Sequence, residues 1–333
     1  MDAAQAYRAV SAVVEPVYMV GGSVRDTLMG RECHDHDFAT PLDPDRIEAL
    51  VRAAGRRPYL VGKKFGTVGF RVDGEIVEVT TFRTESYANG SRKPLVTFLG
   101  ELAEDLARRD FTINAMALQG EEVIDPFGGR DDLQARLVRA VGDPLARFDE
   151  DPLRMLRAVR FAAELDFEVD PATASAIAET PGRILDVARE RWMLELDRLL
   201  VGPAASRGMR LLAETGLLRY LLPELSLQPA LPDPRHAAAS LFDATLSALD
   251  AASADPTARW AALLGGAGWP YVDGAPSAGQ GAPGAREAAR DRDEAARLIG
   301  IEIVERTALY LKWSNRRRAE VARLVRSGGE SPA

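Results

Sequence analysis

Residues 17–40, VYMVGGSVRDTLMGRECHDHDFAT, contain the pattern that decides the fold. The apolar run at residues 17–20 ends at Gly21-Gly22 and predicts a strand that feeds a tight turn. A glycine pair leaves backbone N–H groups accessible to a phosphate, and the start of a following helix adds a favourable dipole. Arg25 stands in the first turn of that helix, where it could grip a triphosphate. The stretch therefore predicts a strand–turn–helix unit for a phosphate-bearing ligand.

Two aspartates follow the glycine pair. Asp35 and Asp37 lie two residues apart on a predicted strand, so their side chains point to the same face. Paired carboxylates suit Mg²⁺, which keeps octahedral geometry and bridges substrate phosphates. The alternative is a loop glycine pair beside two solvated aspartates. A zinc site at residues 33–36 is disfavoured, because the chain has only one further histidine.

The surrounding sequence predicts a mixed α/β unit and then a helical array. Strand patterns cover residues 37–40, 66–72 and 75–80, the last two joined by a hairpin turn at Asp73-Gly74. Residues 44–54 carry apolar side chains at helical spacing. From about residue 130 the chain becomes rich in Ala, Leu and Arg, interrupted at about residues 265–285 by a Gly/Ala/Pro-rich insert that we expect to be flexible.

Composition bounds the class of protein. The 333 residues suffice for two or three domains, and the net charge of −8 argues weakly against nucleic-acid binding. Local basic clusters such as Arg316-Arg317-Arg318 can coexist with an acidic average. The single cysteine excludes an intramolecular disulfide framework and favours the cytoplasm. No apolar run reaches the roughly 18 residues of a membrane span, so we expect no membrane partner.

Two further groups of residues suggest chemistry. Arg109 and Asp110, in an RRD run, could serve a phosphate and a ribose hydroxyl, although such a run is more often a solvated helix face.

The second group begins at Asp151, which stands before a proline and predicts a helix start with Asp151 as N-cap. Arg154, Arg157 and Arg160 then fall on one arc of the helix, opposite an apolar stripe and with Glu150 near the middle of the arc. A solvated face would also explain these arginines. A guanidinium and a carboxylate could instead read the donor–acceptor edge of a base.

Several motifs in this order resemble the class II tRNA nucleotidyltransferase/poly(A) polymerase family. They are GGSVRD (21–26) with DHD (35–37), TFRTE (81–85), RRDFTINAMA (108–117), DPFGG (125–129), EDPLRMLRAVRF (150–161) and RERWMLEL (189–196). The resemblance covers roughly residues 17–200 and is loose beyond them.

The resemblance implies an α+β fold and an activity. The N-terminal head, residues 1–135, would be a nucleotidyltransferase palm with a mixed β-sheet and helices. An all-α neck (136–200) would carry the template for the nucleotide base, and a helical body and tail (201–333) would bind tRNA. The implied activity is the addition of CCA, or of CC or A alone, to the tRNA 3′ end from CTP and ATP, with release of pyrophosphate.

The resemblance also implies residue roles. In the palm these are catalysis and Mg²⁺ binding for Asp35 and Asp37, triphosphate contact for Gly22 and Arg25, and sugar and phosphate contact for Arg109 and Asp110. In the neck they are base reading by Glu150, Asp151 and Arg154 with support from Arg157 and Arg160. Glu78, on the strand before TFRTE, is a candidate third carboxylate.

Two departures from the family pattern limit the expected activity. Ala244 and residues 261–268 stand where many bacterial relatives carry phosphohydrolase ligands, so we expect no phosphohydrolase activity. Between TFRTE and RRD, residues 91–95 read SRKPL, which lacks the acidic residue usual in enzymes that add the full CCA. A poly(A) polymerase and a catalytically dead RNA-binding protein remain alternatives, and the sequence leaves the oligomeric state open.

Overall fold

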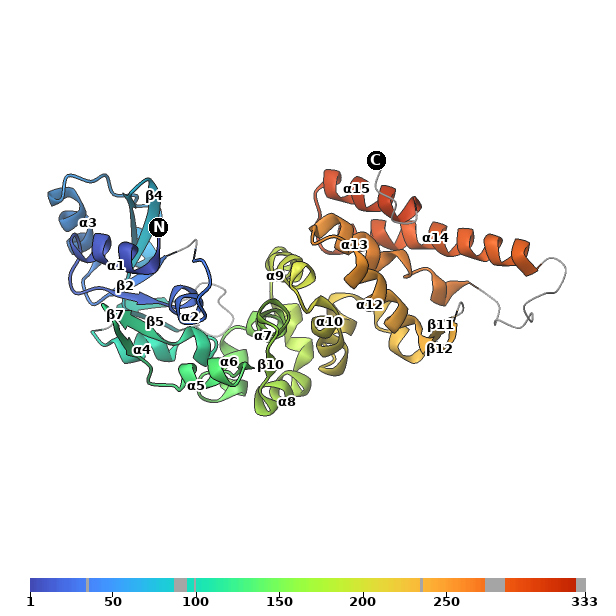
Figure 1. Ribbon diagram of the computed structural model, residues 1–333, viewed down its shortest axis with the longest axis horizontal. Helices are drawn as coiled ribbons and strands as arrows, with labels where there is room; N and C mark the ends of the chain where they lie inside the picture. The colour runs from blue at the N-terminus through green and yellow to red at the C-terminus, as the bar shows by residue number, and fades with distance from the viewer. Residues whose placement is uncertain (34–35, 87–94, 99, 234–235, 273–284, 328–333) are drawn as a thin grey trace. The chain divides into compact units, whose positions relative to one another are not determined.

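The chain folds into two compact units, Met1–Glu150 and Asp151–Ala333 (Figure 1). The computed structural model describes residues 1–33, 36–86, 95–98, 100–233, 236–272 and 285–327. Helices and strands mix in the first unit, whereas helices dominate the second. The predicted α+β class is therefore confirmed.

A six-stranded mixed sheet forms the centre of the first unit. In spatial order the strands are β3 (Thr67–Val72), β4 (Glu75–Thr81), β2 (Asp37–Thr40), β1 (Tyr18–Val20), β7 (Ala117–Gln119) and β8 (Glu122–Ile124). The pair β2–β4 is parallel, and the other neighbours are antiparallel. The hairpin predicted at Asp73-Gly74 is confirmed, because β3 and β4 pair across it and both turn residues have positive φ.

Alternation along the strands fixes the two faces of this sheet. Met19 and Phe38 face a core formed with helices α1 (Ala3–Ser11) and α3 (Pro44–Ala53). The neighbouring Val20 and Ala39 face the other way, where Leu106 of α4 (Leu102–Ala107) packs against them. The remaining elements of the unit are α2 (Gly22–Leu28), α5 (Gly129–Gln134), β9 (Leu137–Val138), α6 (Pro144–Glu150) and the hairpin of β5 (Arg83–Ser86) with β6 (Leu95–Phe98).

The structure differs from the sequence patterns around the RRD motif. A solvated helix face is the wrong interpretation of residues 108–110, because α4 ends at Ala107 and Asp110 is buried. The hairpin of β7 and β8, around Gly120, has no counterpart among the predicted strands. Strands of three residues are too short for a period-two alternation to stand out.

The second unit is built from helices. They are α7 (Leu153–Leu165), α8 (Pro171–Glu179), α9 (Arg189–Val201), α10 (Ala205–Glu214), α11 (Leu218–Leu221), α12 (Leu241–Ala251), α13 (Pro256–Gly265), α14 (Ala285–Tyr310) and α15 (Asn315–Arg326), with short strands β10 (Glu168–Val169), β11 (Pro232–Asp233) and β12 (His236–Ser240). The predicted helix is found, but its start lies one residue later than expected, because α7 begins at Leu153 with Pro152, not Asp151, as N-cap. Asp151 lies just before it and accepts the N–H of Leu153 at 3.1 Å.

Helix α9 ties several of these helices together. Asp197 on α9 accepts a hydrogen bond from the indole of Trp260 on α13, at 2.8 Å, and pairs with Arg317 of α15 at 2.8 Å. Trp260 is fully buried, and its ring lies 5.1 Å from that of Trp313. A single carboxylate thus satisfies a buried indole and an arginine from different helices.

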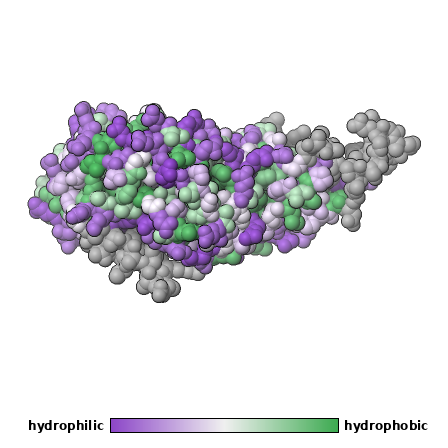
Figure 2. All heavy atoms as spheres, turned by 90° about the horizontal axis from the view of Figure 1, so that it is seen from below, coloured by the Kyte–Doolittle hydropathy of each residue, from purple (hydrophilic) through white to green (hydrophobic). Residues whose placement is uncertain are grey.

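Hydrophilic and hydrophobic residues are intermixed over the face seen in Figure 2. Among the described residues, no helix is long and apolar enough to cross a membrane.

The expectation of a flexible insert at about residues 265–285 is wrong for its first part, while residues 273–284 lie outside the described residues. Gly265 closes α13, Ala267 is fully buried, and Trp269–Tyr271 form a 3₁₀ helix. Composition misleads here because the small residues are needed for packing. A Cβ on Gly268 would meet the backbone oxygen of Ala296, in α14, at 1.9 Å.

We predict that Gly268→Ala lowers the thermal unfolding midpoint of the protein, followed by circular dichroism. The added methyl has no room beside the α14 backbone, and overpacking costs about 1–3 kcal/mol. Gly265→Ala is the matched control, because a Cβ there meets no atom within 4 Å. Equal midpoints for the two variants would show that residues 265–268 are not packed as described.

Candidate active site

The turn between β1 and α2 brings two guanidinium groups onto the backbone of the glycine pair. Gly21 has φ +71° and ψ −138°, a conformation open only to glycine. A Cβ on Gly21 would lie 2.7 Å from Nη1 of Arg109, and one on Gly22 would lie 3.5 Å from Nη2 of Arg25. Gly21 therefore serves both the turn and the close approach of Arg109, whereas a Cβ on Gly22 would be in ordinary contact with Arg25.

Arg25 is buried and held from two sides. Its Nε and Nη2 donate to the carboxylate of Asp26 at 2.9 and 2.8 Å. Its Nη1 donates to Oδ1 of Asn114 at 2.8 Å. These contacts leave the guanidinium little freedom to reorient, so a ligand would meet a fixed cation.

Arg109 is anchored by the buried carboxylate of Asp105 on α4. Asp105 lies 2.7 Å from Nη2 of Arg108 and 3.3 Å from Nη2 of Arg109, and it also accepts the backbone N–H of Arg83 at 3.2 Å. Burial lowers the pKa of the Arg109 guanidinium, while the carboxylates of Asp105 and Asp37 act against that shift. Because a guanidinium keeps its proton in proteins, Arg109 is a poorly hydrated cation near Asp37.

Asp37 lies exposed at the start of β2, with Glu78 beside it. The parallel register pairs Asp37 with Glu78 of β4, which is also exposed. Paired residues of adjacent strands point to the same face about 5 Å apart. The backbone N–H of Asp37 donates to Ser23 Oγ at 3.0 Å, which links this strand to the glycine turn. The predicted partner Asp35 lies outside the described residues.

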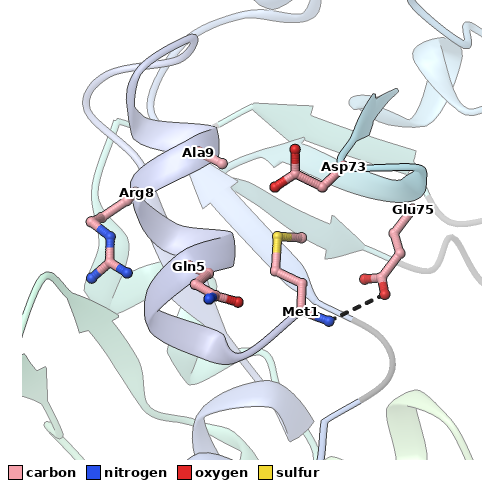
Figure 3. A pocket seen from close by; sticks show the side chains of 6 residues that line it. All are labelled: Met1, Gln5, Arg8, Ala9, Asp73 and Glu75. Carbon is pink, nitrogen blue, oxygen red and sulfur yellow. Dashed lines mark hydrogen bonds and ion pairs between the residues drawn. The ribbon is translucent and has the colours of Figure 1, made fainter.

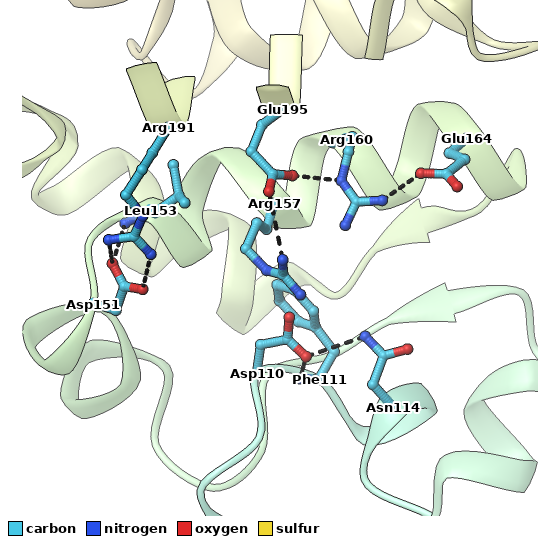
Figure 4. A network of polar contacts seen from close by, with 10 residues as sticks. All are labelled: Asp110, Phe111, Asn114, Asp151, Leu153, Arg157, Arg160, Glu164, Arg191 and Glu195. Carbon is cyan, nitrogen blue, oxygen red and sulfur yellow. Dashed lines mark hydrogen bonds and ion pairs between the residues drawn. The ribbon is translucent and has the colours of Figure 1, made fainter. Parts of the chain in front are cut away.

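Asp110 joins Arg25 through Asn114. Its Oδ1 accepts the backbone N–H of Phe111 at 2.9 Å and the Nδ2 of Asn114 at 3.1 Å (Figure 4). Asn114 in turn accepts from Arg25. Arg25 and Asp110 thus share one polar network through Asn114, whereas Arg109 belongs to a second network around Asp105. Both guanidinium groups lie at the Gly21-Gly22 turn.

The predicted base-reading residues lie at the end of α6, between α6 and α7, and on α7. Glu150 ends α6, where Arg147 donates to it. Asp151 accepts from Nη2 of Arg191 at 2.7 Å (Figure 4), while Arg154 is half-buried on α7. A carboxylate held by an arginine keeps its direction.

Arg157 and Arg160 both turn to Glu195 of α9. Arg157 Nη1 lies 3.4 Å and Arg160 Nε 2.6 Å from this carboxylate, and Arg160 also pairs with Glu164 (Figure 4). Arg160 is only 2% exposed, and burial lowers the pKa of its guanidinium. The three arginines therefore do not form one solvated arc, because Glu195 draws Arg160 into the core. A nucleotide contact by Arg160 stays a prediction.

The arginines of α15 also have acidic partners. Arg316 lies 3.0 Å from Glu320, Arg317 pairs with Asp197 of α9, and Arg318 lies 3.3 Å from Glu305. These ion pairs neutralise much of the positive charge of the Arg316-Arg317-Arg318 cluster, which is a candidate for contact with tRNA in the sequence.

Several anchoring residues were not assigned from the sequence. Asp105 stands three and four residues before Arg108 and Arg109, a spacing that could have revealed the pairing. Asp26 is the direct neighbour of its partner Arg25. The contacts of Asn114 with Arg25 and of Arg191 with Asp151 have no such local signal, because they join residues 89 and 40 positions apart.

Two surface hollows lie apart from these residues. An open hollow of about 500 Å³ is lined by Met1, Gln5, Arg8, Ala9, Asp73 and Glu75, with the terminal ammonium 3.2 Å from Glu75 (Figure 3). A hollow of about 910 Å³ in the helical unit is lined partly by Ala244, Ala261, Ala262 and Gly265. These small side chains stand at the positions compared with the phosphohydrolase ligands, and they offer no metal donor.

A glycine turn under two fixed cations, beside exposed carboxylates on a mixed sheet, defines a nucleotidyltransferase palm. Residues 17–139 match the family of poly A polymerase head domains. Residues 166–228 match a second family, the probable RNA and SrmB-binding site of polymerase A.

Known proteins agree with these matches. The CCA-adding enzyme of Geobacillus sp. (strain WCH70) is 47% identical over 206 residues, 61% of this chain and 50% of the relative, and that of Levilactobacillus brevis is 48% identical over 205 residues, 61% of this chain and 51% of the relative. The crystal structure of the Bacillus stearothermophilus CCA-adding enzyme in complex with CTP superposes with a TM-score of 0.65 and 32% identity, covering 99% of this chain and 78% of that one.

A tRNA nucleotidyltransferase complexed with a primer tRNA and an incoming ATP analog gives a TM-score of 0.53 at 27% identity, covering 74% of this chain and 70% of the other. The chain spans about half the length of the curated relatives it matches. The chain belongs to the class II tRNA nucleotidyltransferase/poly(A) polymerase family, as its motifs predict, and this family normally uses a divalent metal ion.

We predict that Asp105→Asn lowers the free energy of unfolding by about 2 kcal/mol or more, because two arginines lose a buried counter-charge. The amide keeps the shape of the carboxylate, so the loss reports charge rather than packing. Glu104→Gln on the same helix is the control, and an exposed substitution should stay within about 0.5 kcal/mol. Denaturant unfolding measures both; equal values would remove Asp105 as the anchor.

Proposed function

We propose that the chain is a tRNA nucleotidyltransferase that adds CCA, or part of it, to the tRNA 3′ end from CTP and ATP. The observation that carries the proposal is the pair of anchored guanidiniums over Gly21-Gly22 beside Asp37. Relatives named as CCA-adding enzymes support it. In the reaction the terminal 3′-hydroxyl of tRNA bonds to the α-phosphorus of the nucleotide, the bond to the β-phosphate oxygen breaks, and pyrophosphate leaves while the hydroxyl proton passes to solvent.

The residues of the first unit would bind and orient the nucleotide. Arg25 and Arg109 would hold the triphosphate as fixed cations, with Gly22 giving them and the phosphates close access to the backbone. Asp110 would accept a ribose hydroxyl.

We propose Mg²⁺ as the divalent ion, held by Asp37 and Asp35. The fit rests on Asp37, an exposed carboxylate with Glu78 beside it, since both supply the hard oxygen donors that Mg²⁺ prefers. When bound, Mg²⁺ would stabilise the charge that develops on the phosphate oxygens.

The neck (residues 136–200) would read the base of the incoming nucleotide, and the body and tail would hold the tRNA. Glu150, Asp151 and Arg154 would meet the base edge of the incoming nucleotide, and Arg191 would direct the Asp151 carboxylate. Arg157 and Arg160 would support them by fixing α7 to α9. We propose further that the chain divides into a head (1–135), a neck (136–200), and a body and tail (201–333), and that the protein is cytoplasmic.

The product formed on tRNA that lacks all three terminal nucleotides tests the function. We expect a complete CCA end when CTP and ATP are supplied together, measured by sequencing of the 3′ ends. Arrest after two cytidines would mean CC addition, and extension only of tRNA already ending in CC would mean A addition. Residues 91–94, on which this choice depends in part, lie outside the described residues.

A poly(A) tail on unrelated RNA would favour a poly(A) polymerase instead. No extension of any RNA would contradict the proposed activity.

We predict that Asp37→Ala lowers turnover by orders of magnitude while folding is retained, because the exposed carboxylate supplies binding for the metal rather than packing. Single-turnover incorporation of CTP measures the effect, with exposed Glu122→Ala on edge strand β8 as the control. A variant that keeps more than about a tenth of the wild-type rate has lost less than about 1.4 kcal/mol of transition-state stabilisation. Such a result would contradict the assignment of Asp37 as a metal ligand.

A further inference from the structure

The side-chain amide of Asn114 lies between two buried charged groups of opposite sign. It accepts from Nη1 of Arg25 at 2.8 Å and donates to Oδ1 of Asp110 at 3.1 Å. All three side chains are at most 8% exposed. Figure 4 shows the amide directed at Asp110.

The chemistry of its partners fixes the orientation of this amide. A guanidinium only donates hydrogen bonds, so it must meet the amide oxygen. A carboxylate only accepts them, so Asp110 must meet the amide nitrogen. A 180° flip would oppose like groups on both sides, and the Asn114 side chain therefore has one stable setting.

Backbone hydrogen bonds also fix the positions of Asn114 and Asp110. Asn114 ends a short 3₁₀ helix, and its N–H donates to the oxygen of Phe111 at 2.9 Å. The N–H of Phe111 donates to the same Oδ1 of Asp110 that Asn114 contacts, at 2.9 Å. Two donors on one oxygen set the plane of the carboxylate.

Arg25 has a second anchor that does not involve Asn114. Asp26 accepts from its Nε and Nη2 at 2.9 and 2.8 Å. Hence Arg25 keeps a charged partner if Asn114 changes, whereas Asp110 loses the amide that donates to its Oδ1. Substitutions at Asn114 and Asp26 can therefore separate the two ends of the network.

We infer that Asn114 is a positioning residue that sets the direction of the Asp110 carboxylate toward the ribose of the incoming nucleotide and links it to the triphosphate arginine Arg25. The inference rests on the proposed function. Through Asn114, selection of a ribonucleotide over a 2′-deoxynucleotide depends on a hydrogen bond made inside the palm.

Asn114→Asp is the sharpest test. The new carboxylate still accepts from Arg25, but it repels Asp110 in place of donating to it. We expect the ratio of kcat/KM for CTP to that for 2′-deoxy-CTP to fall about tenfold or more, as for loss of a charge-assisted hydrogen bond. Inhibition by pyrophosphate should weaken as well, because the new carboxylate adds a negative charge beside Arg25.

Asp26→Asn is the matched control at the other end of the network. It removes a counter-charge from Arg25 and leaves the bond between Asn114 and Asp110 in place. We expect weaker pyrophosphate inhibition with an unchanged ratio of CTP to 2′-deoxy-CTP. A merely structural role for Asn114 would lower the unfolding midpoint of Asn114→Asp without moving this ratio.

The remaining outcomes are decisive as well. If Asn114→Asp does not fold, Asn114→Ala, which removes both bonds and adds no charge, should lower the ratio and weaken pyrophosphate inhibition together. Asp110→Asn should lower the ratio alone, and adding Asn114→Asp to it should lower it no further.

A wild-type ratio in the folded Asn114 variants, with CTP still incorporated, would overturn the inference and leave the proposed function intact. Wild-type protein that incorporates neither CTP nor ATP would instead contradict the proposed function.

Discussion

The close approach of two guanidinium groups to the Gly21-Gly22 backbone is the constraint on which the first unit depends. It requires a turn without side chains, since a Cβ on Gly21 would lie 2.7 Å from Arg109. It also requires buried counter-charges, because cations removed from water are unstable without them. Asp105 and Asp26 supply these charges, and Asn114 extends the network to Asp110. The sheet contributes the carboxylates of Asp37 and Glu78, which lie opposite each other on β2 and β4.

The second unit uses the same principle. Helix α9 presents Glu195 to the arginines of α7 and Asp197 to Trp260 and Arg317. On a helical wheel the arginines of α7 form a solvated stripe. In the structure, their pairing with Glu195 draws part of this stripe into the core. The RERWMLEL motif consequently stabilises the helices that carry the proposed base-reading residues, and its acidic positions are structural.

Local patterns in the sequence predict the glycine turn, the β3–β4 hairpin, helix α7 and the helical second unit, because each depends on residues close together in the chain. The family resemblance adds the roles of the site residues. The long-range anchors of the arginines were not predictable: Asn114 and Glu195 meet partners 89 and 38 residues away, and periodicity carries no information on such pairs. The folded start of the supposed insert was missed for a related reason, since glycine can mark close packing as well as flexibility.

The affinity for CTP of Gly21→Ala, beside Gly30→Ala, tests the central claim most directly. Both glycines have positive φ, +71° and +65°, but only at Gly21 would a Cβ meet a guanidinium. Isothermal titration of the folded variants should show CTP bound at least about tenfold more weakly by Gly21→Ala, or about 1.4 kcal/mol, and near wild-type affinity for Gly30→Ala. Wild-type affinity in Gly21→Ala would contradict the account, because Arg109 would then not need its place against the glycine backbone.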